Sequence, residues 1–137
     1  MSITTSYFAV AKKLNGAKIS IARFNRFARK VGIDEILESF APSSELLIDY
    51  KESRISWEQY VERYTSEQKK HYKEKPSDFE NLLQRGEKED LALLCYEKFE
   101  GKQTRCHRMI LFDMLKYLAG ELGYKPEFIE EEPYKRK

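Results

Sequence analysis

The sequence is poor in cysteine, proline and glycine, with 2, 4 and 6 of them in 137 residues. Two cysteines are too few for the disulfide-dense class of small secreted domains, so we expect free thiols, ligands or a redox pair. The chain also lacks internal repeats, low-complexity segments, a signal-peptide pattern and any apolar run near the ~18 residues of a membrane-spanning helix. We therefore expect a soluble, cytoplasmic protein with no membrane partner.

The composition predicts one folded domain over residues 1–137. Hydrophobic residues make up 41% of the chain and charged residues 35%, with 8 Phe, 9 Tyr and 1 Trp, which is too apolar and aromatic for a disordered protein. The net charge is only +2, from 25 basic and 23 acidic residues. Any affinity for polyanions must therefore come from local clusters of charge.

Two β-rich segments open the chain. Residues 2–14 are rich in Thr, Tyr, Phe and Val, and residues 17–24 contain alternating isoleucines. Asn15 and Gly16 between them form a turn dipeptide that tolerates positive φ. The simplest interpretation is a strand, a turn and a second strand, either as a hairpin or as parallel strands connected through other elements.

Helical signals fill the middle of the chain. The helices predicted there from caps and from apolar spacing span residues 33–40, 44–51, 57–72 and 76–86. Ser56 and Gln59 make a capping box at the start of the third of these helices. Trp57, Tyr60 and Tyr64 recur at helical spacing, and we interpret this aromatic stripe as core packing in preference to ligand stacking.

The near-continuous apolar run over residues 91–97 is typical of a strand buried on both faces, and we predict that it is the central strand. Thr104 caps a further predicted helix that ends at Gly123, and a short strand is predicted around Phe128 and Ile129. This order indicates an α/β fold, a single-domain layered sandwich with a small, mostly parallel sheet flanked by helices. Ligands of such folds usually bind at the carboxyl edge of the sheet.

The residues with the most reactive side chains gather where the predicted central strand meets the following helix. Cys95 and Glu97 occupy alternate positions near the end of the strand, so they point to the same face. The first turn of the predicted helix carries Arg105, Cys106, His107 and Arg108. A helix start with cationic neighbours favours bound anions and favours the thiolate form of a cysteine.

These groups suggest an anion-binding or catalytic pocket, although plain helix capping with surface charge explains the helical turn equally well. In the catalytic interpretation, Cys106 is the first choice as nucleophile and His107 is a general acid or base. Glu97 is either a proton acceptor or the ion-pair partner of Arg105 or Arg108. The spacing matches neither a Walker loop nor a short phosphatase loop, so it names no known reaction.

The two cysteines have other interpretations. A zinc site would use Cys95, Cys106 and His107, but close-spaced ligand pairs are absent, so we expect no metal and no cofactor. A disulfide between the cysteines is sterically possible and would act as a redox switch. We favour two reduced, partly buried thiols, with Cys95 packed in the core.

The strongest basic cluster follows the second predicted strand. It comprises Arg23, Arg26, Arg29 and Lys30, interleaved with aromatic residues. Residues 132–137 form a short basic tail with at most weak affinity for polyanions. His71 lies in the polar run 67–75, and we expect it to be solvated.

These motifs together resemble the "domain of unknown function 488" (DUF488) family. A strand ending in Leu-Leu-Cys-x-Glu, followed by a Cys-His-Arg that opens a helix, is similar to the family signature, and Cys95, Glu97 and Cys106 occupy those positions. The Ala-Pro-Ser segment at residues 41–43 and the Trp-x-x-Tyr helix extend the resemblance to about residues 18–131. Family members often carry Asp-Arg or Asp-Val-Arg after the second strand and then Pro-Arg, whereas this chain lacks the acidic residue. After the second strand, the resemblance therefore extends only to Arg23 and Arg26.

The resemblance implies a small α/β domain without an established reaction. Our leading hypothesis is a pocket for an anionic small molecule or a nucleic-acid phosphate, with catalysis through Cys106. The candidate ligand-binding residues are Arg23, Arg26, Cys95, Arg105 and Arg108. The alternative is a non-enzymatic nucleic-acid-binding module that uses the basic cluster at residues 23–30.

Overall fold

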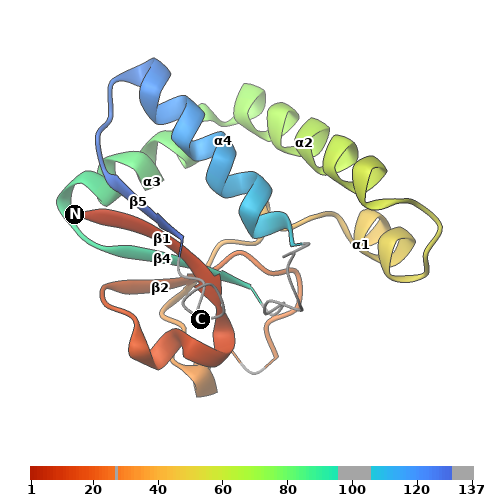
Figure 1. The fold of residues 1–137 in the computed structure, drawn as a ribbon, viewed down its shortest axis with the longest axis horizontal. Helices are drawn as coiled ribbons and strands as arrows, with labels where there is room; N and C mark the ends of the chain where they lie inside the picture. The colour runs from red at the N-terminus through yellow and green to blue at the C-terminus, as the bar shows by residue number, and fades with distance from the viewer. Residues whose placement is uncertain (27, 96–105, 131–137) are drawn as a thin grey trace, which may run out of the picture.

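A parallel β-sheet forms the centre of the protein, whose computed structural model describes residues 1–26, 28–95 and 106–130. Within these residues all five strands are parallel, in the order β3-β2-β4-β1-β5 (Figure 1). The strands are β1 (Ser2–Tyr7), β2 (Ala17–Ser20), β3 (Glu35–Ile36), β4 (Leu91–Cys95) and β5 (Glu127–Glu130). The predicted α/β sandwich is confirmed, and β4 is the central strand as predicted.

Side-chain caps start two of the four helices in the described residues, and a glycine ends a third. They are α1 (Ser44–Lys51), α2 (Trp57–Glu74), α3 (Pro76–Lys88) and α4 (His107–Leu122). The side chain of Ser43 caps α1, and Ser56 and Gln59 form the predicted capping box of α2. Gly123 ends α4 in the left-handed conformation, with φ of 82°. No helix in the described ranges is both long enough and apolar enough to span a bilayer.

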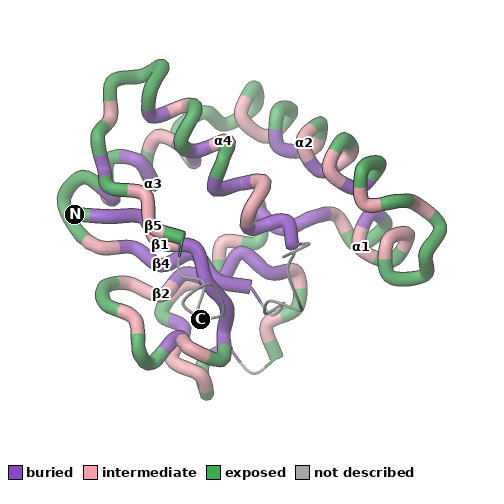
Figure 2. Tube along the Cα trace, in the orientation of Figure 1, coloured by how far each residue is buried: buried purple, intermediate pink, exposed green. Residues whose placement is uncertain are grey.

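The two faces of the sheet are covered differently. The helices α2, α3 and α4 lie over one face, and their apolar side chains pack with Ile3, Leu91 and Leu93 in the larger buried cluster (Figure 1). Short 3-10 segments, η1 (Phe8–Lys13) and η2 (Arg29–Val31), lie over the other face around Ala92 and Leu94. As a result β4 is buried along its whole length, as Figure 2 shows.

The first two strands do not form a hairpin, which was one of the two arrangements that the sequence left open. The turn itself forms, with Gly16 at φ of +83°, but β4 lies between β1 and β2 and pairs in parallel with both. The first predicted strand also stops early, because the chain leaves the sheet after Tyr7 and continues as η1. Of the two arrangements left open by the sequence, the parallel one is found.

The predicted helix over residues 33–40 is also wrong. The backbone N–H of Asp34 donates to the carbonyl of Lys18 (2.8 Å), and that of Leu37 donates to the carbonyl of Ser20 (2.9 Å). These bonds build the edge strand β3 against β2, and only a 3-10 turn, η3 (Glu38–Phe40), follows it. Long-range pairing therefore overrides the helical spacing of the apolar residues.

His71 is not solvated, contrary to expectation. Its side chain is only 12% exposed and packs against the rings of Phe40 and Phe79, with ring centroids 4.9 and 4.7 Å away. Its Nε2 lies 2.8 Å from a carboxylate oxygen of Asp78, and its Nδ1 lies 3.0 Å from the side-chain oxygen of Gln68. The polar sequence around His71 did not reveal these contacts, because both aromatic partners come from other elements.

Candidate functional site

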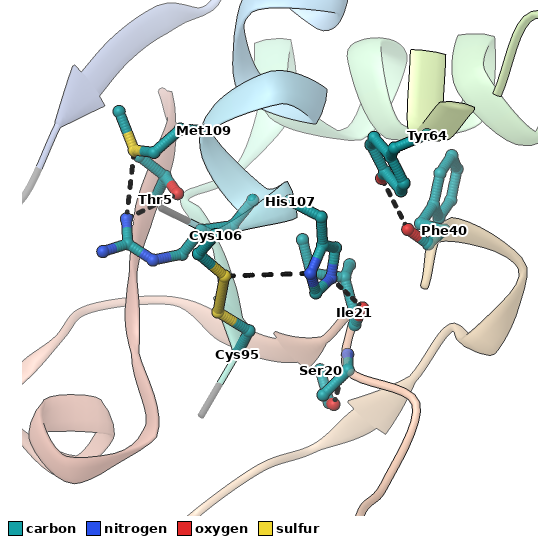
Figure 3. Close-up of a disulfide and its surroundings, with 11 residues drawn as sticks. Thr5, Ser20, Ile21, Phe40, Tyr64, Cys95, Cys106, His107 and Met109 are labelled. Atoms are coloured by element: carbon teal, nitrogen blue, oxygen red, sulfur yellow. Dashed lines mark hydrogen bonds between the residues drawn. A yellow bond between two sulfur atoms is a disulfide. The ribbon is translucent and has the colours of Figure 1, made fainter. Parts of the chain in front are cut away.

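The carboxyl ends of the central strands bring distant parts of the sequence to the same edge of the sheet. Tyr7 at the end of β1 is in register with Cys95 at the end of β4, and Ser20 at the end of β2 is in register with Leu94. The helix α4 starts at the same edge, with Cys106 as its N-cap residue (Figure 3). The sequence predicted a site at this edge.

Cys95 and Cys106 are joined by a disulfide in the structure (Figure 3). Their residues are 0% and 3% exposed, and both belong to the buried cluster that contains Phe8 and Leu94. The expectation of two reduced thiols is therefore wrong for this state, because the end of β4 and the start of α4 bury both sulfurs together. Among the described residues, no group of three or more His, Cys, Asp or Glu side chains is arranged to hold a metal ion.

His107 connects the start of α4 to the end of β2. Its Nε2 lies 2.6 Å from the carbonyl oxygen of Ile21, and its Nδ1 lies 3.7 Å from Sγ of Cys106 (Figure 3). A carbonyl can only accept a hydrogen bond, so Nε2 must carry the hydrogen. In the neutral imidazole, Nδ1 then presents a lone pair toward the sulfur.

The surroundings of His107 disfavour its protonated form. The pKa of His107 is lowered to about 4, mainly by burial; the positive charges of Arg108 and Arg23 add to this shift, and the hydrogen bond to Ile21 opposes it. His107 is therefore neutral at pH 7. The two arginines therefore place positive charge close enough to His107 to act on its titration.

Arg108 places a cation inside the protein. Its residue is 1% exposed, and Nη1 donates to Thr5 Oγ1 in β1 (3.2 Å) and to Sδ of Met109 (3.3 Å). Water screens a buried charge much less than a surface charge. Arg108 therefore acts on its neighbours over a longer range than an exposed arginine would.

A hydrogen bond to residues 41–43 holds Arg23 near His107. The Nε of Arg23 donates to the carbonyl of Pro42 (3.0 Å). The hydroxyl of Ser43 donates to one carboxylate oxygen of Glu67 in α2 (2.6 Å), and its backbone N–H donates to the other (2.9 Å). Because Ser43 also caps α1, this segment ties the loop after β2 to two helices.

The other predicted site residues lie elsewhere. Arg26 is on the exposed turn that follows Arg23. Glu97 and Arg105 fall outside the described residues, as do Thr104 and the basic tail at residues 132–137.

Sequence reasoning missed the polar side chains that line the strand ends. Thr5 accepts the hydrogen bond from Arg108, and Ser20 is hydrogen-bonded to Asn25 in the turn after β2. The hydroxyl of Ser6 is buried and has no hydrogen-bond partner among the described residues. The sequence of β1 contains several polar residues in a strand that is otherwise buried. This pattern was the signal that could have revealed these side chains.

A cleft of about 530 Å³ opens beside Cys106 and His107. Its other walls come from α1, from the turn at residues 52–56 and from the start of α2, and they include Tyr50, Ser53 and Trp57. Although Cys106 and His107 are almost fully buried, both line this cleft.

The chain matches a family model described as "Active DUF488-N3 subclade" over residues 3–119. No curated protein and no solved structure matches the chain. The family match includes the ends of β1, β2 and β4 and the start of α4, and it confirms the resemblance carried by the Ala-Pro-Ser segment and the two cysteine motifs. The chain therefore belongs to the DUF488 family, in its DUF488-N3 subclade.

Proposed function

We propose that this DUF488 protein is a cysteine-dependent enzyme that binds an anionic ligand, a nucleotide or a nucleic-acid phosphate, at the carboxyl edge of its sheet. The observation that carries this proposal is the 3.7 Å contact between Sγ of Cys106 and Nδ1 of His107. Activated thiols are typically paired with a base that a third group orients. Here the third group is the carbonyl of Ile21, 2.6 Å from Nε2 of the same imidazole.

In the proposed reaction, the reduced Cys106 thiol gives its proton to Nδ1 of His107. The sulfur then forms a bond to an electrophilic centre of the ligand, and the leaving group departs with the electron pair of its bond. The neutral state of His107 at pH 7 supports this role, because only the neutral imidazole can accept the proton. Glu97 is proposed as a second proton acceptor.

The positive charges near Cys106 support an anionic ligand. Arg108 is buried, and Arg23 is held by the carbonyl of Pro42; both lower the pKa of His107 by their charge. An anion bound next to them would offset this positive field. We propose that Arg105 and Arg26 also contribute to ligand binding, whereas Cys95, which is 0% exposed, lies outside the lining of the cleft.

In the disulfide, the sulfur of Cys106 is bonded to Cys95 and cannot act as a nucleophile. The proposed enzyme is therefore active only after this disulfide has been reduced. A dithiol supplies the two electrons by disulfide exchange, which leaves two protein thiols and converts the dithiol to its own disulfide. We expect activity in the reduced protein and none in the oxidised protein.

The proposal is tested by the alkylation rate of each cysteine in the reduced protein, measured by mass spectrometry with iodoacetamide at neutral pH. Cys106 lines the cleft and adjoins His107, so it should react faster than Cys95, and inorganic phosphate should slow it. Cys95→Ser should preserve the rate of Cys106, whereas His107→Gln should reduce it. Equal and slow labelling of both thiols, unaffected by phosphate, contradicts the proposal.

A second candidate function, a nucleic-acid-binding module, is favoured by the exposure of Phe24. This side chain is 58% exposed, and Arg26, Arg29 and Lys30 are exposed on the following turns. An exposed aromatic ring among basic residues is typical of surfaces on which single-stranded nucleic acids stack.

This candidate is tested by salt-titrated binding of a single-stranded oligonucleotide. Neutralising Arg26, Arg29 and Lys30 should weaken binding and flatten its salt dependence, because fewer counterions are released. Cys106→Ala should leave the binding unchanged. If the salt dependence of binding is the same in this variant as in the wild type, the nucleic-acid-binding function is excluded.

A further inference from the structure

We infer that the cleft between α1 and the start of α2 binds the planar heteroaromatic base of a nucleotide, with the phosphate of that nucleotide at Cys106 and His107. This inference rests on the proposed function, since it names the class of anionic ligand that reaches Cys106. It is carried by the aromatic wall of the cleft, by the polar groups around that wall and by the position of the two site residues.

The cleft has the size of a small-molecule site. Its volume is about 530 Å³, within the range of roughly 300 to 1,000 Å³ that is usual for ligand pockets. Cys106 and His107 contribute one wall, and α1 and α2 contribute the others. A ligand that fills the cleft therefore has one part against the helices and another part against the thiol.

The aromatic wall comes from two different helices. Tyr50 of α1 lies 5.7 Å from Trp57 and 4.9 Å from Tyr60, between ring centroids, and the rings of Trp57 and Tyr60 are stacked at 5.1 Å with an interplanar angle of 15°. Tyr60 is 3% exposed, so it packs in the core as predicted. Its buried ring holds the rings of Tyr50 and Trp57 in place. Tyr50 and Trp57 are only half-buried, so they present ring surface to the cleft.

The polar groups of the cleft distinguish it from a purely apolar hollow. Ser53, Ser56 and Glu58 line it together with the aromatic rings, and they offer hydroxyl and carboxylate groups for the polar edges of a base. By contrast, the groove of about 750 Å³ between α2 and α4 is lined mainly by apolar side chains such as Met109 and Met114. A flat ring with hydrogen-bonding edges therefore suits the cleft better than it suits the groove.

Ser53 has the one non-glycine backbone with positive φ among the described residues, at 58°. Its N–H donates to the carbonyl of Tyr50 (3.0 Å), which closes the turn after α1. Non-glycine residues adopt this conformation at a cost, and such positions are concentrated at ligand sites. The turn brings Ser53 into the lining of the cleft.

The charges at the cleft support the orientation of the nucleotide. The cations Arg23 and Arg108 act on His107, at the end of the cleft formed by Cys106. Among the side chains that line the cleft, Glu58 of α2 and Lys51 of α1 carry opposite charges, so neither sign prevails away from these arginines. A phosphate is therefore favoured near Cys106, and the base is favoured near Trp57.

Trp57 is the only tryptophan of the chain and lines both the cleft and the groove, so its fluorescence reports a ligand in either and the variants below assign it. We would titrate the reduced protein with adenosine and cytidine monophosphates, with ribose 5-phosphate and with inorganic phosphate, and follow the tryptophan fluorescence. A stacked base should quench Trp57 saturably. Because base stacking on an aromatic ring is lost in ribose 5-phosphate, this compound should bind about five- to a hundredfold more weakly than the better nucleotide.

Two variants separate the cleft from the groove. Tyr50→Ala removes an aromatic wall of the cleft and should weaken nucleotide binding by a similar factor. Tyr117→Ala is the matched control, since this tyrosine is 68% exposed and lines the groove between α2 and α4. If Tyr50→Ala disturbs folding, Trp57→Phe keeps an aromatic ring and should retain protection of Cys106 by the nucleotide against iodoacetamide.

The outcomes distinguish this inference from the function on which it rests. Protection of Cys106 by ribose 5-phosphate equal to that by both nucleotides would overturn the base subsite and leave the anion-binding enzyme standing. No protection by any phosphate compound would overturn both. Quenching that Tyr117→Ala abolishes and Tyr50→Ala preserves would assign the ligand to the groove and contradict the inference.

Discussion

The two edges of the same sheet differ in how they use their polar residues. At the amino edge the polar contacts close the fold: the hydroxyl of Ser2 donates to a carboxylate oxygen of Asp90 (2.9 Å), and the N–H of Ala17 donates to the Asp90 carbonyl (3.0 Å). At the carboxyl edge a neutral imidazole, a buried guanidinium and two sulfurs meet beside a cleft.

The polar contacts that close the fold and the groups of the candidate site therefore lie at opposite edges of the sheet. The hollow at the amino edge, about 410 Å³, is lined by none of the described cysteines or histidines. The carboxyl edge keeps titratable groups in conditions that disfavour their charged form, as the low pKa of His107 shows. Substitutions at the amino edge should therefore change stability, and those at the carboxyl edge should change reactivity and its dependence on pH.

The largest expected effect is at the amino edge, for Gly16→Ala. Gly16 has φ of +83°, and a Cβ atom there would lie 1.9 Å from the backbone oxygen of Asp90. Because a backbone atom cannot move away cheaply, we expect a loss of about 3 to 5 kcal/mol in the free energy of unfolding, measured by urea denaturation.

Gly120→Ala in α4 is the matched control for that change. A Cβ atom at Gly120 has no other atom within 4 Å, so this variant should gain about 0.5 to 1 kcal/mol. At urea concentrations where both variants are folded, Cys106 should alkylate at the wild-type rate. A slower Cys106 in folded Gly16→Ala would break the separation of the two edges.

An effect of intermediate size is expected from His107 at the carboxyl edge. Its folded pKa of about 4 lies below the 6.5 of an ordinary histidine, so the unfolded chain takes up a proton first as the pH falls. This contribution to stability is complete above about pH 6.5 and is lost as the pH falls through about 4, to a total of up to about 3 kcal/mol. Urea unfolding at a series of pH values measures it.

His107→Gln provides the comparison for the pH series. The variant should lack this part of the acid sensitivity, so the difference between the two curves should shrink toward low pH. Equal slopes for both proteins between pH 7 and 4 would show that His107 is protonated with an ordinary pKa in the folded protein.

The smallest effect is expected for Ser43→Ala, which removes the cap of α1 and the hydrogen bond to Glu67. We expect a loss of about 1 to 2 kcal/mol in stability. Because segment 41–43 also holds Arg23, the variant should also weaken the slowing of Cys106 alkylation by phosphate. Ser44→Ala, on the exposed first residue of α1, is the control and should change neither quantity.

The sequence predicted those elements whose signals are local. The capping box of α2, the buried central strand and the glycine that ends α4 were all recognised, because each depends on residues adjacent in the chain. The helix predicted over residues 33–40 failed because Asp34 and Leu37 pair with β2, which no local pattern reports. The environment of His71 was missed for the same reason.

The site was predicted in part. The strand end and helix start that carry Cys95, Cys106 and His107 follow from the order of elements in a parallel fold, so their approach was foreseeable. The bond from His107 to the carbonyl of Ile21 was not foreseeable, since a backbone carbonyl leaves no signature in the sequence. Nor does any sequence pattern announce the left-handed backbone of Ser53.

The late position of the central strand in the sequence has a consequence for how the protein folds. β1 and β2 do not pair with each other, and β1 is joined to the β2–β3 pair only through β4, which follows three helices later in the chain. A topology dominated by such distant pairings is expected to fold slowly, because loop closure costs entropy before any pairing compensates for it. During synthesis, we therefore expect the roughly 90 residues that precede β4 to emerge before β1 has a partner, and the candidate site to assemble only when β4 is inserted.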